Sequence, residues 1–264
     1  MGGRKKDVHF YIDCSDKRNE FLYDALKEER YRVSVYRADA AYSDDFTGER
    51  VFLFAPAAEL IPETAQKIPA GSRVFCFMCE ERVHQIFLQN GVTVHKYFDD
   101  ELLAMKNAYL TAEGALAIII ENTDSSVRDM RVLVLGGGRV GKSVAKLLHD
   151  NRCSVFVATI DPTEYAFASI FSGVYYFSEY PKHLHKFDLI VNTVPEIVLK
   201  GEDLEKIKKD CFILDLASKP GGVDFEEARR LGLKTAHALG IPGKTAPRSA
   251  GLAIKESVLN TLGG

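Results

Sequence analysis

Short apolar runs alternate with amphipathic stretches along the first hundred residues of the chain. We predict strands over residues 8–12, 31–36, 51–54, 74–77 and 92–94. Apolar side chains recur at helical spacing over residues 19–30, and residues 85–91 resemble the end of a further helix. Strands that alternate with helices at this spacing are typical of a parallel sheet that helices cover on both faces.

A longer apolar helix is predicted over residues 99–123. Asp99 or Asp100 can cap its N-terminus, and its apolar positions continue as far as Ile120. Gly114 stands in the middle of this segment, where glycine costs ~1 kcal/mol relative to alanine. We therefore expect another part of the backbone, or a ligand, to approach the helix closely at Gly114.

The strand and helix pattern starts again after residues 122–126. A buried strand over 131–135 runs directly into a glycine-rich loop over 136–141 and then into a helix over 142–149. Further strands are predicted over 155–157, 189–191, 212–214 and 235–238, and a last helix over 249–262. This alternation predicts a second α/β domain with its own parallel sheet.

Composition narrows the class of protein. Apolar residues make up 46% of the 264 residues and charged residues 27%, which is ordinary for a folded globular protein. The net charge of −3 gives no basis for binding nucleic acid or an anionic membrane, because such partners need clustered positive charge. The apolar run over 115–120 is far shorter than the ~20 residues that span a bilayer. We therefore expect a cytoplasmic protein with no nucleic-acid or membrane partner.

The five cysteines are an odd number spread over a long chain, which argues against a disulfide framework and for a reducing compartment. Cys76 and Cys79 have the CxxC spacing of redox and zinc motifs. They follow an apolar segment that resembles a buried strand, and no second CxxC is present to complete a zinc site. We interpret them as two buried structural thiols and predict no metal site.

Gly136, Gly138 and Gly141 match GxGxxG, the fingerprint of dinucleotide-binding domains. The first glycine permits a tight turn, the second lets a pyrophosphate approach the backbone, and the third lets the helix pack on the strand. The pyrophosphate would then lie on the free N–H groups at the helix N-terminus. The motif and the repeated pattern predict two Rossmann-like, doubly wound parallel-sheet domains joined by a long helix, as in hydroxyacid dehydrogenases.

Residues 136–143 also match GxxxxGK[ST], the pattern of a phosphate-binding P-loop. In a P-loop Lys142 and Ser143 would both turn toward the phosphates, whereas here they fall in the first turn of the predicted helix. The loop is also short, and Val140 can pack beneath the helix. We favour the dinucleotide site over the P-loop, and a glycine turn that binds nothing is a third interpretation.

The second strand of a dinucleotide-binding unit normally ends in an acid that binds the 2′-hydroxyl of the adenosine ribose. That position falls near Thr159, and Asp161 comes two residues later. A threonine removes the repulsion toward a 2′-phosphate, but no arginine or lysine follows to bind one. The choice between NAD and NADP therefore stays open.

Ligands of doubly wound sheets bind at the carboxyl ends of the strands. Three of the predicted strands are each followed by a segment rich in turn-forming residues, over 192–195, 215–222 and 239–248. One interpretation is ordinary turn chemistry. We favour a rigid rim around a nicotinamide, with polar and cationic side chains available to an anionic substrate: Ser218, Lys219, Lys244 and Arg248.

Five segments resemble the family of dipicolinate synthase A subunits: residues 108–114, 136–141, 191–195, 214–222 and 240–251. The segments over 214–222 and 240–251 are specific to that family, whereas GxGxxG is not. The resemblance covers about residues 98–262. Asp16 and Arg18 match an early Asp-x-Arg of the family, but the first hundred residues are shortened and residues 76–80 depart from the usual small-residue turn.

The resemblance implies an NAD(P)-dependent oxidoreductase that oxidises dihydrodipicolinate to dipicolinate (pyridine-2,6-dicarboxylate) in spore formation. It also implies a separate flavoprotein-like B subunit, and we expect a homo-oligomer. The alternatives are a non-catalytic NAD(P)-binding partner subunit, another NAD(P)-dependent dehydrogenase and a P-loop phosphohydrolase. The predicted parts are a substrate domain over 1–98, an interdomain helix over 99–124, an NAD(P)-binding domain over 125–247 and a C-terminal helix over 248–264.

The product is a dianion, and Lys219 and Arg248 match positions where the family has basic residues. The predicted substrate-binding residues are Arg18, Thr111, Glu113, Ser218, Lys219 and Arg248. For Thr111 and Glu113, a capping or buried hydrogen-bonding role is an equal alternative. The predicted cofactor-binding residues are Gly136, Gly138, Arg139, Val140, Gly141, Thr159, Asn192, Thr193, Val194, Pro195, Asp215, Gly240 and Pro242.

Oxidation to an aromatic ring supplies its own driving force, so a strong acid or base is not required and no catalytic residue is assigned. His237 lies near the predicted cofactor rim. The resemblance does not include a histidine there, and we interpret His237 as a packed strand residue.

Overall fold

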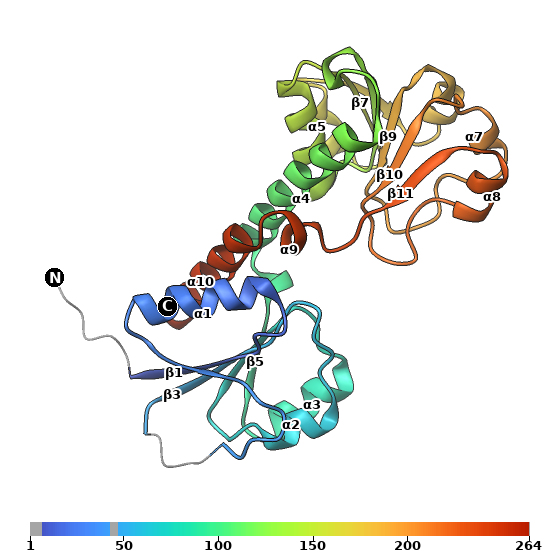
Figure 1. Cartoon of the computed structure of the whole chain (residues 1–264). Helices are drawn as coiled ribbons and strands as arrows, with labels where there is room; N and C mark the ends of the chain where they lie inside the picture. Colours follow the sequence, from blue (N-terminus) through green and yellow to red (C-terminus); the bar gives the residue numbers. More distant parts are fainter. Residues whose placement is uncertain (1–6, 43–46, 264) are drawn as a thin grey trace. The chain divides into compact units, whose positions relative to one another are not determined.

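The computed structural model describes residues 7–42 and 47–263, and the chain divides into two compact units. Unit 1 comprises residues 1–107 and 246–264, and unit 2 comprises residues 108–245. The boundary falls within the long helix α4 (Glu101–Asn122), which matches the predicted helix closely (Figure 1). Each unit is a parallel sheet with helices on both faces, as the alternating sequence pattern predicts.

Unit 1 contains a five-stranded parallel sheet in the order β2-β1-β3-β4-β5. Its strands are β1 (Val8–Ile12), β2 (Arg32–Val35), β3 (Glu49–Leu53), β4 (Arg73–Cys76) and β5 (Thr93–Lys96). Its helices are α1 (Lys17–Glu28), α2 (Pro62–Lys67), α3 (Glu81–Gln89) and α10 (Pro247–Gly263), with a single 3-10 turn at Tyr97–Asp99.

Helices cover the two faces of this sheet in pairs. Phe10 and Val51 belong to a buried cluster that includes residues of α1 and α10, whereas Phe52 and Val74 belong to a second cluster with residues of α2 and α3. Alternate residues of a strand point to opposite faces, so a strand covered on both sides is apolar throughout. α10, the last helix of the chain, therefore completes the core built by the first hundred residues.

Close packing of α10 on α1 depends on Gly251. A Cβ atom at this position would lie 2.2 Å from the carbonyl oxygen of Arg18, so only glycine lets the two backbones approach this closely. Ile254 and Val258 of α10 then pack in one buried cluster with Leu22 and Leu26 of α1. The sequence pattern predicts α10 as a helix, and its packing partner comes from the far end of the chain.

Unit 2 contains a six-stranded parallel sheet in the order β11-β10-β9-β6-β7-β8. Read from β8 and with β6 counted as the first strand, this order is 3-2-1-4-5-6, the strand order of dinucleotide-binding folds. Its strands are β6 (Arg131–Leu135), β7 (Ser154–Thr159), β8 (Gly173–Tyr176), β9 (Leu189–Asn192), β10 (Phe212–Asp215) and β11 (Lys234–His237). The prediction of two doubly wound parallel-sheet domains is confirmed.

The helices of unit 2 are α5 (Arg139–Asp150), α6 (Pro162–Ala168), α7 (Glu202–Glu205), α8 (Phe225–Arg230) and α9 (Ile241–Thr245). Single 3-10 turns lie at Val127–Asp129, Tyr180–Lys182 and Leu184–Lys186. Val132 and Val134 of β6 pack with α4 and α5, whereas Leu133 and Leu135 pack on the opposite face with α7 and α8.

β8 is a strand that the sequence pattern does not predict. It is short and begins with Gly173, which weakens a strand in isolation. In the sheet Gly173 pairs with Phe156, and a Cβ atom at Gly173 would lie 2.4 Å from the Phe156 ring. The glycine therefore leaves room for the aromatic ring of the neighbouring strand, a cross-strand contact that has no local signal in the sequence.

The prediction that Cys76 and Cys79 are both buried is wrong for one of them. Cys76 is buried at the end of β4, and burial raises the pKa of its thiol to about 12. Cys79 lies beyond the strand and is only half-buried, although burial raises the pKa of its thiol as well. Neither thiol has the lowered pKa of a reactive cysteine, and both are free.

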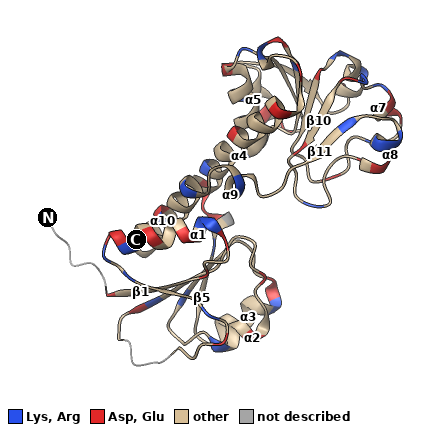
Figure 2. Ribbon diagram, viewed as in Figure 1, with Lys and Arg blue, Asp and Glu red and all other residues tan. Residues whose placement is uncertain are grey.

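Within the described residues, α4 is the one helix long and apolar enough to cross a membrane, judged by length and composition alone. Ala112, Ala115 and Ile119 of this helix lie in the buried core of unit 2, as in a core helix of a folded domain. Side chains of both charge signs are interspersed over the helices of each unit, in keeping with the net charge of −3 (Figure 2).

Candidate functional site

The glycine loop of unit 2 joins β6 to α5 and is built by close contacts. Gly136 has a φ of 94°, which favours glycine, and a Cβ atom there would lie 2.5 Å from the Thr193 hydroxyl oxygen. A Cβ atom at Gly141 would lie 2.0 Å from the Gly136 carbonyl oxygen. These two glycines therefore let the loop turn sharply and let α5 pack directly against it, as the GxGxxG pattern predicts.

Gly138 is open to a ligand. It is the N-cap of α5, and the nearest atom to a Cβ built on it is a Glu164 carboxylate oxygen at 3.8 Å. Within the described part of the chain, no side chain caps the first turn of α5, and that turn carries no acid. The N–H groups that begin a helix lack intrahelical partners and attract anions. The bare backbone and the uncapped helix N-terminus fit a dinucleotide pyrophosphate.

The contacts of Lys142 and Ser143 favour the dinucleotide interpretation over the P-loop. The Ser143 hydroxyl donates back to the Arg139 carbonyl oxygen at 2.9 Å, within its own helix. The Lys142 ammonium lies 5.5 Å from the centre of the Phe167 ring on α6. Val140 packs against the buried core of unit 2, as predicted. Both groups that a P-loop turns toward phosphate therefore have other positions here.

The end of β7 holds a feature that the sequence pattern does not predict. Thr159 is 1% exposed, and its hydroxyl donates to the Glu164 carboxylate at 2.6 Å. That carboxylate lies against the glycine loop, because a Cβ atom at Gly137 would be 2.7 Å from one of its oxygens. An acid therefore reaches the loop from α6 rather than from the strand end where one is normally found.

A local signal for Glu164 is present in the sequence. Asp161 is the N-cap of α6 and is followed by Pro162 and, three residues after the cap, by Glu164, which is the spacing of a capping box. In the structure the Asp161 carboxylate accepts from the Glu164 N–H at 3.0 Å, but the Asp161 N–H donates to the Thr159 hydroxyl at 3.1 Å. The Glu164 side chain is thereby left for the glycine loop.

Asn192 and Asp215 link the segments that follow β9 and β10. Asp215 is fully buried and accepts from Asn192 Nδ2 at 2.8 Å, from the Ala217 N–H at 3.0 Å and from the Gly222 N–H at 2.7 Å. Asn192 also donates to the Val194 carbonyl oxygen at 2.9 Å and accepts from the Val194 N–H at 3.1 Å. This network fixes both loops at the carboxyl edge of the sheet.

The loop after β9 also contacts the glycine loop directly. The Thr193 hydroxyl donates to the Leu135 carbonyl oxygen at 2.8 Å. A Cβ atom at Gly136 would lie 3.1 Å from Val194 Cγ2. Pro195, which follows, is exposed. The structure therefore brings the predicted segments over 136–141 and 192–195 together at one edge of the sheet.

The predicted polar rim is exposed in part. Ser218 and Lys219 are exposed on the loop after β10. Gly240 directly precedes α9, and Pro242 lies in its first turn.

His237 Nε2 lies 2.8 Å from the Ala217 carbonyl oxygen, and its ring stacks on Phe225 with centroids 5.4 Å apart. The interpretation of His237 as a packed strand residue is confirmed.

α4 supplies the close approach expected at Gly114. A Cβ atom there would lie 2.2 Å from Ile241 Cγ2 and 2.8 Å from the Thr245 hydroxyl oxygen. The group that comes close is therefore the side-chain surface of α9 rather than a backbone or a ligand. Thr111 is half-buried on the same helix, and Glu113 is exposed.

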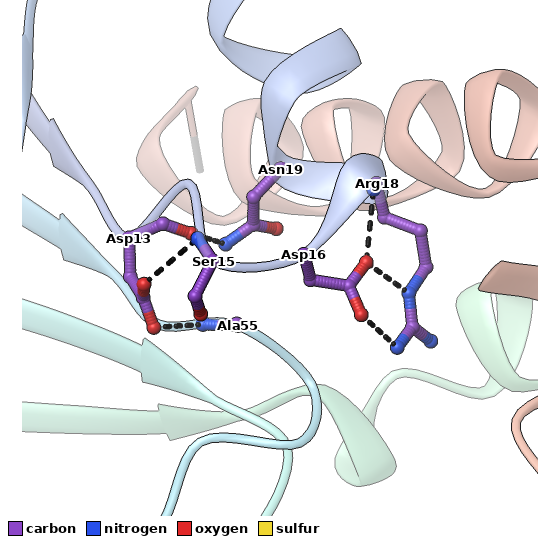
Figure 3. Close-up of polar contacts among 6 residues, drawn as sticks. All are labelled: Asp13, Ser15, Asp16, Arg18, Asn19 and Ala55. Atoms are coloured by element: carbon purple, nitrogen blue, oxygen red, sulfur yellow. Dashed lines mark hydrogen bonds and ion pairs between the residues drawn. The ribbon is translucent and has the colours of Figure 1, made fainter.

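Unit 1 carries a second polar cluster at the carboxyl end of β1, drawn in Figure 3. Asp13 accepts from the Ser15 N–H at 3.1 Å and from the Ala55 N–H at 3.2 Å, and Asn19 Nδ2 donates to the Asp13 carbonyl oxygen at 2.8 Å. These bonds tie the turn after β1 to the segment after β3.

Asp16 and Arg18 form the other half of this cluster (Figure 3). Asp16 caps α1 by accepting from the Arg18 N–H at 2.9 Å, and the Arg18 guanidinium donates to the Asp16 carboxylate at 2.8 and 2.7 Å. The hydrogen bonds from the Arg18 side chain lower the pKa of Asp16. Arg18 is thus a nearly buried, oriented cation, whereas Arg248 is exposed in the first turn of α10.

Comparison with known proteins identifies relatives of both the sequence and the fold. Residues 117–231 match the model of the shikimate / quinate 5-dehydrogenase family. The A subunit of dipicolinate synthase from Bacillus subtilis (strain 168) is 29% identical over 220 residues, which cover 83% of this chain and 72% of that protein.

Solved structures extend the likeness to both units. The crystal structure of the dipicolinate synthase A subunit from Bacillus halodurans has a TM-score of 0.81 and 25% identity, and the match covers 97% of each chain. The N-terminal region that we expect to be shortened is included in this match. The NAD complex of a D-isomer specific 2-hydroxyacid dehydrogenase from Lactobacillus delbrueckii ssp. bulgaricus has a TM-score of 0.60 at 11% identity, covering 97% of this chain and 96% of the other.

These comparisons confirm the predicted resemblance and the hydroxyacid-dehydrogenase-like fold. The family model matches unit 2, where the glycine loop and the dinucleotide-type strand order lie. In sequence and in fold, the chain is similar to the A subunit of dipicolinate synthase, and its unit 2 has the fold of a nicotinamide-dependent dehydrogenase.

Proposed function

We propose that the chain oxidises dihydrodipicolinate to dipicolinate with NAD(P)⁺ as the acceptor. The observation that supports this most is its similarity to the dipicolinate synthase A subunit over 83% of its length. In this reaction a ring C–H bond breaks and its electron pair passes to the nicotinamide as a hydride, while a proton leaves to solvent. The products are the aromatic dicarboxylate, NAD(P)H and a proton, so atoms and charge balance.

A bound dinucleotide supplies the hydride acceptor, and the chain's own residues hold it. The open backbone at Gly138 and the N-terminus of α5 suit the pyrophosphate. Thr193 holds the neighbouring loop against the glycine loop. Asn192 and Asp215 are positioning residues in this proposal, because their side chains bond to each other and to loop backbone.

Substrate binding requires cations, because the substrate carries two carboxylates. We assign the cations to Lys219, Arg18 and Arg248, and we assign to Ser218 the role of a hydrogen-bond donor to a carboxylate. Thr111 and Glu113 of α4 stay predicted substrate contacts. Aromatisation favours loss of the hydride and the proton, so the proposal needs no strong general base.

The proposal also includes a separate B subunit and a cytoplasmic location. The five free cysteines agree with such a location, because thiols stay reduced in the cytoplasm. The competing function is a chain that holds NAD(P) without performing the chemistry alone. The two differ in what the purified chain does without its partner, which makes one assay decisive.

The test mixes the purified chain with freshly generated dihydrodipicolinate and NAD⁺ or NADP⁺, with and without the B subunit. We expect dipicolinate and reduced nicotinamide to appear together in equal amounts. Turnover only in the presence of the B subunit supports the non-catalytic alternative, and none under either condition contradicts the proposed reaction.

Gly138→Leu tests whether the glycine loop binds the dinucleotide. The φ of Gly138 is an ordinary −66° and a Cβ atom meets nothing closer than 3.8 Å, so the variant should fold normally. A leucine side chain would occupy the space assigned to the pyrophosphate. We expect dinucleotide binding to be lost, while unchanged affinity would contradict the assignment of the glycine loop.

A further inference from the structure

The Glu164 carboxylate is held in a defined position beside the glycine loop. One of its oxygens, Oε2, accepts the Thr159 hydroxyl at 2.6 Å. Cβ atoms built on Gly137 and Gly138 would lie 2.7 Å from Oε2 and 3.8 Å from Oε1, respectively. The side chain is half-buried, so protein atoms limit its freedom while a ligand can reach it.

The strand order relates the position of Glu164 to the place of the adenosine ribose in dinucleotide-binding folds. In a sheet of order 3-2-1-4-5-6, the adenosine ribose lies between the loop after the first strand and the end of the second strand. Here those elements are the loop after β6 and the end of β7. Thr159 ends β7 and carries no carboxylate of its own, but its hydroxyl donates to the carboxylate of Glu164. An acid therefore lies beside the glycine loop although the strand end lacks one.

The chemistry of the two cofactors differs at this point. A carboxylate accepts a hydrogen bond from the ribose 2′-hydroxyl of NAD, whereas the 2′-phosphate of NADP carries negative charge and would be repelled. Asp161 adds a second negative charge nearby, and its pKa is lowered by hydrogen bonds from the Glu164 and Thr163 N–H groups. Both acids thus favour NAD.

Lys142 is the group that argues in the other direction. Its ammonium lies over the Phe167 ring of α6, 5.5 Å from the centre, and its charge contributes to the lowered pKa of Asp161. It could pair with a 2′-phosphate if Glu164 were neutral. Its charge already acts on the Asp161 carboxylate, and the Glu164 carboxylate would repel a 2′-phosphate placed beside the glycine loop.

We propose that Glu164 selects the cofactor: its carboxylate, oriented by Thr159, accepts the 2′-hydroxyl of the adenosine ribose, so the chain prefers NAD to NADP. This inference rests on the proposed function only in requiring that unit 2 binds a nicotinamide dinucleotide. It identifies the discriminating residue on α6, five residues after the strand end where an acid is normally sought.

The test is direct binding of NADH and NADPH to the full chain, followed by fluorescence titration and without substrate. For the wild type we expect NADH to bind at least about 10-fold more tightly than NADPH, since the discriminating contact is a charge-assisted hydrogen bond. Glu164→Gln removes the charge but keeps the shape. In this variant we expect tighter NADPH binding and affinities that differ by less than about 3-fold.

Thr159→Val provides a second variant that keeps the carboxylate but removes its anchor, and it should reduce the preference for NADH partially. Glu226→Gln is the matched control, because Glu226 is an exposed glutamate on α8 and should leave both affinities unchanged. Circular dichroism of each variant establishes that it is folded.

The outcomes separate the inference from the proposed function. If both dinucleotides bind but the wild type prefers NADPH, or Glu164→Gln leaves the affinity ratio unchanged, the inference is wrong and the proposed function stands. If the folded wild type binds neither dinucleotide, the cofactor assignment fails and the inference fails with it.

Discussion

Asp16 performs two tasks at the start of α1. It accepts the Arg18 N–H as the N-cap, and it holds the Arg18 guanidinium through two further hydrogen bonds (Figure 3). The Asp-x-Arg spacing is visible in the sequence, but spacing alone does not distinguish an arginine bonded to its neighbour from one left for a ligand. The structure shows Nε and Nη2 of Arg18 bonded to Asp16, which fixes the direction of the guanidinium.

The first prediction concerns acid stability. Hydrogen bonds from Arg18 lower the pKa of Asp16 below its usual value of 3.8, so the folded state binds fewer protons than the unfolded state at acid pH. The stabilisation is therefore present above about pH 4 and is lost as the pH falls through the lower, folded-state pKa. Asp16→Asn should reduce the free energy of unfolding by about 1–3 kcal/mol at neutral pH and weaken its decline in acid.

Urea unfolding at a series of pH values measures both effects. Asp210→Asn is the control, because Asp210 is exposed and caps no helix in the described chain. An acid dependence that is the same in Asp16→Asn and the wild type would contradict the role assigned to Asp16.

At the scale of elements, α4 and α9 meet at Gly114, and two effects oppose each other there. Helix propensity favours alanine over glycine by ~1 kcal/mol. Packing opposes it, because the added Cβ atom would lie 2.2 Å from Ile241 Cγ2, and Ile241 is 3% exposed. A buried side chain in a filled core has little room to retreat, so we expect packing to dominate.

The second prediction is that Gly114→Ala lowers the free energy of unfolding by about 1–3 kcal/mol, although alanine is the better helix former. Ile241→Ala should be destabilising by itself, yet it should relieve the clash when combined with Gly114→Ala. Denaturant unfolding of the wild type, both single variants and the double variant measures this coupling. Additive effects, or a more stable Gly114→Ala protein, would show that α9 does not restrict this position.

At the scale of the whole molecule, the two ends of the chain belong to the same unit. α10 packs on α1 through Gly251, and Ile254, Val258 and Leu262 are buried in the core of unit 1. Unit 2 is continuous in sequence over residues 108–245 and has its own buried clusters on both faces of its sheet. The stability of unit 1, unlike that of unit 2, should therefore depend on the last nineteen residues, 246–264.

The third prediction is that a chain ending at Thr245 loses the cooperative folding of unit 1 but keeps that of unit 2. Removing α10 exposes Leu22 and Leu26 on α1 and deletes several large buried side chains, which costs more than a marginally stable unit can lose. Hydrogen exchange should show loss of protection in β1 and β3 and retained protection in β6, β9 and β10. Equal protection of both sheets in the shortened chain would contradict this dependence.

Features that depend on neighbours along the chain follow from the amino-acid sequence alone. Short apolar runs predict ten of the strands within about two residues, and the pattern is clearest in the central strands, which are covered on both faces and are therefore mostly apolar. The glycine loop is equally local, since Gly136, Gly138 and Gly141 serve one turn and the first turn of one helix. The fold class and the dinucleotide-type loop can therefore be derived from the order of the residues.

Features that depend on residues far apart in the chain required the three-dimensional fold. β8 pairs with β7 where Gly173 leaves room for the Phe156 ring. The loops after β9 and β10 are joined by Asn192 and Asp215, which are 23 positions apart. The acid at the glycine loop is Glu164 because the turn after β7 brings the start of α6 back to Gly137. Pattern and spacing act over a few residues, whereas packing and hydrogen bonding act between any atoms that the fold brings together.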